Sequence, residues 1–169
     1  MDTLSRYLSN LPDGRSAKVL RPLLEGICDR LSSQLLTSGA LVIKAGASAL
    51  VKAGSILYAT ANGQIVTKAA NTDMAALAGT VTAAKFNVFA FFIDAAGTLT
   101  TSMGTEGASL AAVKFPAIPA RKAMVGFVII NPTGTGNFVG GTTALDDATV
   151  VPGALYVNTV GAFDPSALV

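Results

Sequence analysis

The chain has 169 residues, of which 51% are hydrophobic, 13% are charged and 7% are aromatic, and its formal net charge is +2. A charge so close to zero, without a cluster of Lys or Arg, argues against a nucleic-acid-binding protein, and the apolar content argues against disorder over most of the chain. A chain with so few charges stays soluble most simply by burying surface in an oligomer.

Residues 1–38 are predicted to form an N-terminal helical arm. Leu4, Tyr7, Leu8 and Leu11 indicate a short amphipathic segment, and the main helix is expected from about residue 21 to residue 37. Apolar residues recur there at spacings of four, three, four and four, which places them on one helix face: Leu20, Leu24, Ile27, Leu31 and Leu35. This face is a candidate interface with a neighbouring subunit, and packing on the chain's own domain is the alternative.

Residues 39–169 are predicted to form a β-rich body. Short runs of Val, Ile, Leu and Phe are interrupted by turn residues roughly every eight to twelve positions, which is typical of an all-β sandwich or barrel. The fold class is therefore mainly β, a small antiparallel β-sandwich or barrel, jelly-roll-like, preceded by the α-helical arm. The predicted strands are 41–44, 49–52, 55–60, 64–68, 76–82, 86–93, 98–101, 125–131, 149–151 and 154–159.

Turn residues separate these strands. Asn62-Gly63 is the clearest hairpin turn, and the run from Asp94 to Gly97 is a second. Prolines exclude residues 114–119 from a central strand, because proline has no amide donor for the ladder. The tail from Phe163 is expected to be extended.

The residue types that carry most catalytic and metal chemistry are missing or isolated. The chain contains no His, which removes the commonest general base and metal ligand. Its one cysteine, Cys28, allows no intrachain disulfide and is predicted to be a small buried hydrophobe in the helix. Asp146-Asp147 is predicted to be a pair of solvated turn residues, since no calcium-loop spacing surrounds it. Sugar hydrolases usually line their clefts with aromatic side chains, so the absence of Trp and the low number of Tyr, three, argue against this class.

The glycine-rich stretch 132–141 does not match a phosphate-binding motif. No Gly-Lys-Ser/Thr follows it, and the spacing of Gly134, Gly136 and Gly140 is one residue too long for the dinucleotide fingerprint. A turn-forming loop is expected there. The sequence thus predicts no catalytic, cofactor-binding or metal-binding residue and no cofactor, and the chain is not expected to be an enzyme.

The sequence also shows no membrane-helix or signal-peptide pattern. No apolar run reaches the ~18 residues that a membrane helix needs. The first residues, Met1 to Arg6, lack the basic start and apolar stretch of a signal peptide. The chain is therefore expected to fold in the cytoplasm of the cell that makes it.

Several passages of the body resemble β-rich structural proteins of tailed-bacteriophage virions. These are Lys85-Phe86-Asn87-Val88-Phe89, Asp94-Ala95-Ala96-Gly97-Thr98-Leu99-Thr100, Gly126-Phe127-Val128-Ile129-Ile130-Asn131-Pro132-Thr133-Gly134 and the stretch 138–151. The resemblance covers residues 40–163 and leaves out the helical start. It implies a capsid decoration (cement) protein, a head fibre or a tail component, of a kind that is commonly trimeric, and it transfers no functional residue.

The resemblance implies a decoration protein that binds the outer surface of the major capsid shell and stabilises it by multivalent contacts. The implied partners are further copies, as a homotrimer, and the major capsid protein, without nucleic acid or membrane. The implied location is the capsid surface of the virion, after synthesis in the host cytoplasm. A tail or fibre component is one alternative, and a surface carbohydrate-binding module is a second.

Overall fold

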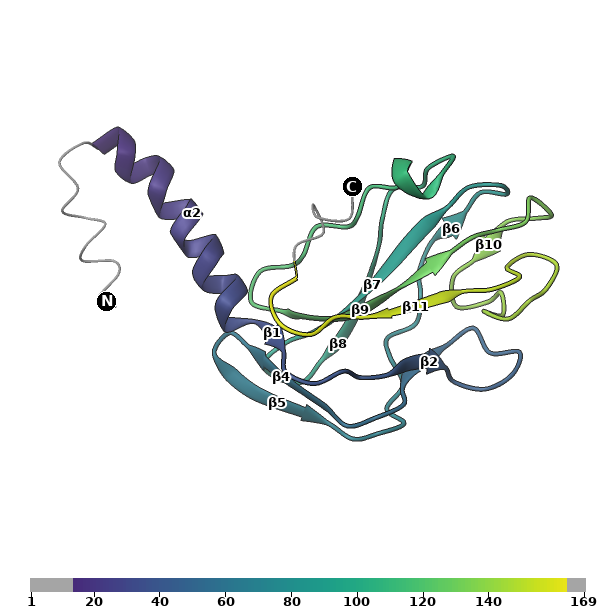
Figure 1. The fold of residues 1–169 in the computed structure, drawn as a ribbon, viewed down its shortest axis with the longest axis horizontal. Coiled ribbons are helices and arrows are strands. Elements are labelled where there is room, and N and C mark those ends of the chain that lie inside the picture. Colours follow the sequence, from purple (N-terminus) through teal and green to yellow (C-terminus); the bar gives the residue numbers. More distant parts are fainter. Residues whose placement is uncertain (1–13, 164–169) are drawn as a thin grey trace.

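The computed structural model describes residues 14–163, which form a β body with a helix at its N-terminal end (Figure 1). The amphipathic segment predicted around Leu4 to Leu11, and the tail beyond Phe163, lie outside the described residues. The elements are α2 (Gly14–Ser32), β1 (Gln34–Leu35), β2 (Leu41–Ile43), β3 (Val51–Ala53), β4 (Leu57–Ala61), β5 (Gln64–Lys68), β6 (Thr80–Val81), β7 (Asn87–Ile93), β8 (Leu99–Met103), the short 3-10 helix η1 (Leu110–Ala112), β9 (Ala123–Ile130), β10 (Phe138–Val139) and β11 (Leu155–Asn158).

The predicted fold class is confirmed: the chain is mainly β, its ladders are antiparallel, and one helix precedes them. A four-stranded sheet has the order β11-β9-β7-β8, and a three-stranded sheet has the order β1-β4-β5. Two smaller pairs, β2-β3 and β10-β6, complete the body. These sheets do not close into a barrel, and Figure 1 shows β2, β4 and β5 lying below the four-stranded sheet, as in a sandwich.

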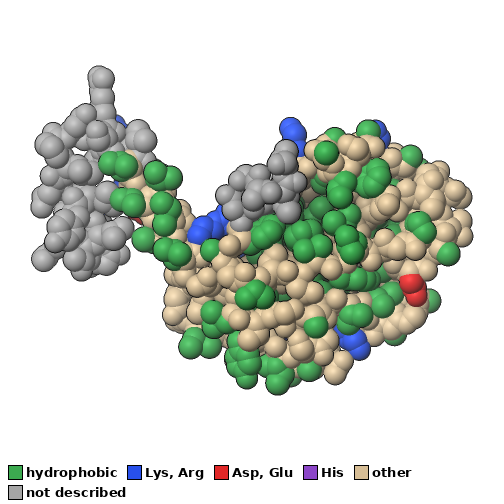
Figure 2. All heavy atoms as spheres, viewed as in Figure 1, with side chains coloured by type: hydrophobic (Ala, Val, Ile, Leu, Met, Phe, Trp, Pro, Cys, Tyr) green, Lys and Arg blue, Asp and Glu red, His purple; other side chains and the backbone are tan. Residues whose placement is uncertain are grey.

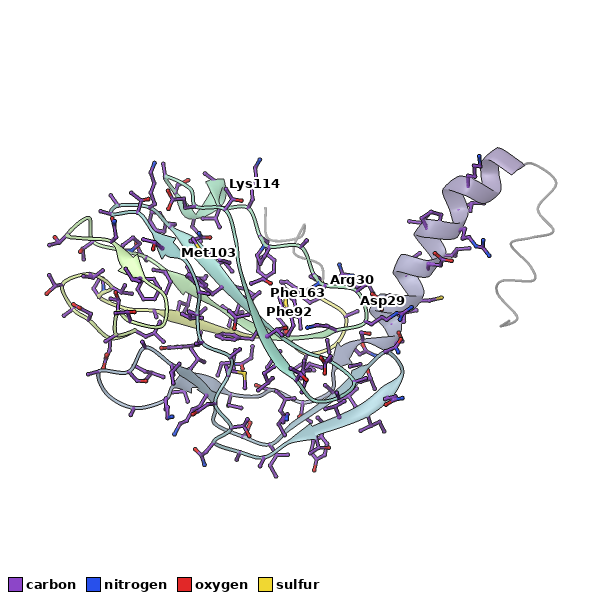
Figure 3. The ribbon with its side chains drawn as sticks, turned by 180° about the vertical axis from the view of Figure 1, so that it is seen from behind. Asp29, Arg30, Phe92, Met103, Lys114 and Phe163 are labelled. Carbon is purple, nitrogen blue, oxygen red and sulfur yellow. The ribbon has the colours of Figure 1, made fainter. Side chains whose placement is uncertain are left out.

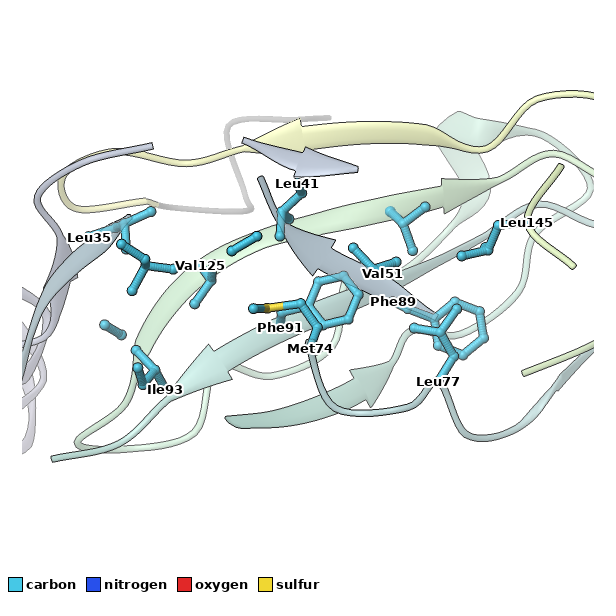
Figure 4. Packing of buried hydrophobic residues seen from close by; sticks show 14 of the residues in the cluster. Leu35, Leu41, Val51, Met74, Leu77, Phe89, Phe91, Ile93, Val125 and Leu145 are labelled. Atoms are coloured by element: carbon cyan, nitrogen blue, oxygen red, sulfur yellow. The ribbon is translucent and has the colours of Figure 1, made fainter. Parts of the chain in front are cut away.

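The main core lies between these layers. Leu35, Leu41, Val51 and Leu57 come from one layer and pack in the same buried cluster as side chains of β7 and β9, among them Phe89 (Figure 4). Burial of apolar side chains is the dominant favourable contribution to folding. The layers are therefore held together chiefly by this cluster.

Every residue of β7 is buried, because both faces of this central strand are covered. Phe89 and Phe91 belong to the main core, whereas Phe92 points to a second cluster on the opposite face. That second cluster includes Phe115, Phe127 and Phe163, whose rings lie 5.2–5.8 Å apart, and Figure 3 shows Phe92 and Phe163 together. A strand buried on both faces has the near-continuous apolar sequence seen here.

The predicted hairpin at Asn62-Gly63 is present. Both residues have positive φ, 50° and 75°, as the tight turn between two strands requires, and they join β4 to β5. Asn is one of the non-glycine residues that tolerate this backbone region best. The turn predicted from Asp94 to Gly97 is also present, between β7 and β8.

Two strand predictions are wrong, and two short strands, β1 and β10, were missed. Residues 149–151 form a turn, because the Asp147 carboxylate accepts the backbone N–H groups of Thr149 and Val150. The predicted strand 76–82 is a strand only over β6. The glycine-rich stretch contains the short strand β10, whose fully buried Phe138 lies edge-on to Phe89 at 5.9 Å.

The helix ends at Ser32, five residues before the expected end near residue 37. Leu35 therefore does not continue the helix face: it lies in β1 and is fully buried in the main core. β1, which follows the helix directly, already pairs with β4. In the part of the chain that the structure describes, no helical segment combines the length and the hydrophobicity needed to cross a membrane.

Candidate interaction surfaces

The arm, defined as α2, exposes large apolar side chains along its length. Leu20, Leu23, Ile27 and Leu31 are 38%, 57%, 45% and 61% exposed, and Leu24 is partly buried. We call these five residues the arm stripe; Leu23 is a member that the sequence prediction missed. Figure 1 shows α2 pointing away from the body, and Figure 2 shows hydrophobic side chains along its described part. The described body therefore leaves the stripe uncovered.

A helix of this kind is poorly stable without a partner. It has 19 residues and contains Pro22 and Gly26, which are the two residue types least favourable inside a helix. Helical stability in proteins comes mostly from packing of an apolar face, and isolated helices of about 15 residues are marginal in water. The exposed arm stripe is thus the face through which a partner would stabilise the arm.

The last turn of the arm is tied to two loops of the body. The Asp29 carboxylate accepts the backbone N–H of Arg121, at 2.9 and 3.1 Å for its two oxygens. The carbonyl oxygen of Ser32 accepts the N–H of Gly63 at 2.9 Å. This bond satisfies one of the carbonyls that a helix C-terminus leaves unpaired. Figure 3 shows Asp29 where the helix meets the body, so the body fixes the direction of the arm.

The expectation that Cys28 is buried is wrong, since the residue is exposed. The described body packs no layer against that side of the arm. Because Cys28 is the one cysteine of the chain, it is also a ready site for a spin label on the arm.

We expect Asp29→Ala to loosen the arm at its base. The change removes both acceptors of the Arg121 N–H, so a nitroxide at Cys28 should become more mobile in its electron paramagnetic resonance spectrum. The free energy of unfolding should fall by about 0.5–1.5 kcal/mol. Glu25→Ala is the matched control, because Glu25 has the same charge but pairs within the helix, with Arg21 at 3.5 Å. Equal label mobility in the Asp29 and Glu25 variants would show that the body does not hold the arm through Asp29.

A second apolar surface lies on the outer face of the three-stranded sheet. We call it the sheet patch: Leu36, Ile56, Tyr58 and Ile65, of which Ile65 is 75% exposed. Alternate residues of β4 point into the core, so Tyr58 points outward. Because Tyr58 pairs with Thr67, Ile65 is its diagonal neighbour on the same face. Figure 2 shows hydrophobic side chains gathered at this lower edge of the body.

The adjacent carboxylates of Asp146 and Asp147 accept hydrogen bonds from turn and loop residues. An Asp146 oxygen accepts the N–H of Ala47 at 3.0 Å, and Asp147 forms the turn described above. Among the residues that the structure describes, no group of three or more His, Cys, Asp or Glu side chains could hold a metal ion. These contacts match the predicted role of the pair as turn residues.

Two further carboxylates hold loops and have lowered pKa values. The N–H of Thr98 lowers the pKa of Asp94, and the N–H and hydroxyl of Thr82 lower that of Glu106. Both carboxylates accept these hydrogen bonds better when they are ionised. The stability that they contribute is therefore present above their ordinary pKa values and is lost as the pH falls through their lowered pKa values.

Tyr156 predicts a loss of stability in alkali. Burial, with a smaller effect of the Asp146 charge, raises the pKa of Tyr156 to about 12 from 10.0. The unfolded chain therefore loses this proton at a lower pH than the folded one, so the stability that Tyr156 contributes is fully present below pH 10 and falls between pH 10 and 12. In urea unfolding at a series of pH values, Tyr156→Phe should lose less stability across this interval than the unsubstituted protein. Parallel curves would contradict the assignment.

The arm stripe and the sheet patch are thus two separate apolar surfaces on one chain, and the described carboxylates discussed above hold turns and loops rather than a shared site. Comparison of the chain with protein-family models, with curated proteins and with solved structures finds no match.

Proposed function

We propose that this chain is a non-enzymatic structural protein of a bacteriophage virion, a capsid decoration protein that binds the outer surface of the major capsid shell as a homotrimer. The resemblance of residues 40–163 to virion proteins suggests this class. The observation that carries the proposal is the pair of apolar surfaces, arm stripe and sheet patch, on one body whose arm is held at a fixed direction.

Two surfaces let one protein join several neighbours. Exposed contiguous apolar patches mark sites of protein association. A contact with the shell and a contact with another copy reinforce each other, because the first contact raises the effective concentration for the second. A stable shell contact would bury on the order of 1,000 Å² or more. We assign the sheet patch to the shell contact, since it is an exposed apolar surface carried by the body itself.

The test is binding of the full-length protein to purified empty shells of the virus that encodes it. We expect the protein to sediment with the shells and to raise their dissociation temperature. Ile65→Lys should reduce occupancy, because it places a charge at the most exposed residue of the sheet patch. Gln64→Lys is the matched control: it adds a Lys at the neighbouring exposed position of β5, off the patch.

The outcomes separate the candidate roles. Binding to purified tails but not to shells would replace the decoration role with that of a tail or fibre component. Binding to neither particle would overturn the virion proposal. Equal loss in the Ile65 and Gln64 variants would remove the sheet patch from the shell contact.

A further inference from the structure

We propose that the arms of neighbouring copies of this chain pack side by side in parallel, with the arm stripe at the centre of the bundle. The occupant of the stripe is a second copy of the same chain. This inference rests on the proposed function for its parallel direction and adds to it the surface through which the copies associate.

The spacing of the stripe is that of a helix-to-helix seam. Leu20, Leu24, Ile27 and Leu31 are separated by four, three and four residues, and all four lie within the uninterrupted helix α2. These separations fit alternating d and a positions of a heptad repeat, beginning with Leu20 at d. The seam fills two heptads, and the helix that carries it is about 28 Å long.

The residues beside the seam suit association of identical helices. In this register Leu23 occupies a g position and Cys28 an e position. A g residue of one parallel helix meets the following e residue of its partner, so Leu23 would meet the partner copy's Cys28. This flanking contact is apolar and brings no like charges together. It also widens the seam, which favours burial of the stripe by another copy of the same helix.

The anchored base sets how the bodies meet. Each arm is tied to its body through Asp29 and Ser32, at the helix C-terminus. Parallel arms therefore gather the bodies at one end of the bundle, where several sheet patches can face one shell surface together. Antiparallel arms would place the bodies at opposite ends. Two heptads alone hold chains weakly, and contacts among bodies gathered at one end add to them.

Cys28 makes the proposal testable in the unmodified, full-length protein. In a parallel bundle the Cys28 thiols of different copies lie at the same level, so a short bismaleimide should link them into covalent dimers under non-saturating conditions. Light scattering should give a mass that is a multiple of 17.0 kDa. Loss of cross-linking in a protein that is still oligomeric would exclude the parallel arrangement.

A pair of variants separates the stripe from the rest of the arm. Ile27→Lys puts a charge in the seam and should weaken association at least about tenfold. Glu25→Gln changes the net charge by the same amount off the seam, at a b position, and should leave association within about twofold. The unfolding of the body should be the same in both variants, because Ile27 and Glu25 are exposed on the arm.

The result that overturns the inference is a monomer at micromolar concentration, with no cross-linking at Cys28. That result would mean that the stripe binds residues 1–13 of its own chain or a capsid subunit. A monomer that still binds shells would remove this inference and the homotrimer, and would leave the decoration role standing. A Cys28-linked oligomer that binds no shell would do the reverse.

Discussion

Replacing Phe89 with Ala is expected to lower the free energy of unfolding by about 3–5 kcal/mol. Phe89 is fully buried in β7, the strand that pairs with both β8 and β9. Its ring lies edge-on to Phe138 at 5.9 Å, so it also holds the short β10–β6 pair against the main sheet. Removing the ring loses the free energy gained by burying it, and it leaves a cavity that a two-layer β core closes only in part.

The measurement is urea unfolding of Phe89→Ala followed by circular dichroism. Phe89→Leu should cost less, since the branched side chain fills part of the space. Ile65→Ala is the control for loss of a large apolar residue from the surface, and its effect should stay within about 0.5 kcal/mol. A loss below about 1 kcal/mol for Phe89→Ala would mean that β7 does not lie in the centre of the core.

The parts of the fold that the sequence predicts well are those governed by local chemistry. Asn62-Gly63 has the turn residues that a two-residue hairpin needs, so the turn and the bounds of β5 are both as predicted. The strands β7 and β9 are readable because a strand buried on both faces is a near-continuous apolar run. In these segments local preference and tertiary burial agree.

The errors fall where a distant segment decides the structure. β10 pairs with β6, which is far away in the sequence, so the two-residue ladder leaves no local signal. The apolar pattern over 76–82 reflects burial of Leu77 and Val81 in the core rather than a continuous strand. Residues 149–151 look like a strand by composition, but the Asp147 side chain bonds to their backbone and closes a turn.

The arm shows the same division between its middle and its ends, since the helix begins at Gly14 rather than near residue 21 and stops at Ser32 rather than near residue 37. Its apolar spacing predicts the helix and four residues of the arm stripe: Leu20, Leu24, Ile27 and Leu31. The spacing does not show where the helix stops, because Leu35 continues the pattern by coincidence and belongs to β1. The stop depends on Gly63, which caps Ser32 from a hairpin tip 31 residues further along the chain. The sheet patch was missed because strand alternation predicts an outward face but not that this face is apolar.

Gly126→Ala is expected to lower the free energy of unfolding by roughly 2–4 kcal/mol. Gly126 has a φ of +155°, which residues with a side chain rarely adopt. An added Cβ would collide with the carbonyl oxygen of Val157 and lie 2.7 Å from Cδ1 of Leu41. The carbonyl belongs to β11, which pairs with β9 at this point, so it cannot move aside without breaking the ladder.

Gly153→Ala is the matched control, because no atom of the described residues lies within 4 Å of its added Cβ. Its effect on the free energy of unfolding should stay within about 0.5 kcal/mol. The contrast tests a specific junction: Asn158, opposite Gly126, also accepts the N–H of Leu41 through its side chain at 2.8 Å and so links β2 to β11. If Gly126→Ala is as mild as Gly153→Ala, β2, β9 and β11 do not meet there. The other outcome is that Gly126→Ala is severe while Cys28 cross-linking survives below the unfolding transition. In that case the damage is confined to the body, and association of the arms does not depend on this junction.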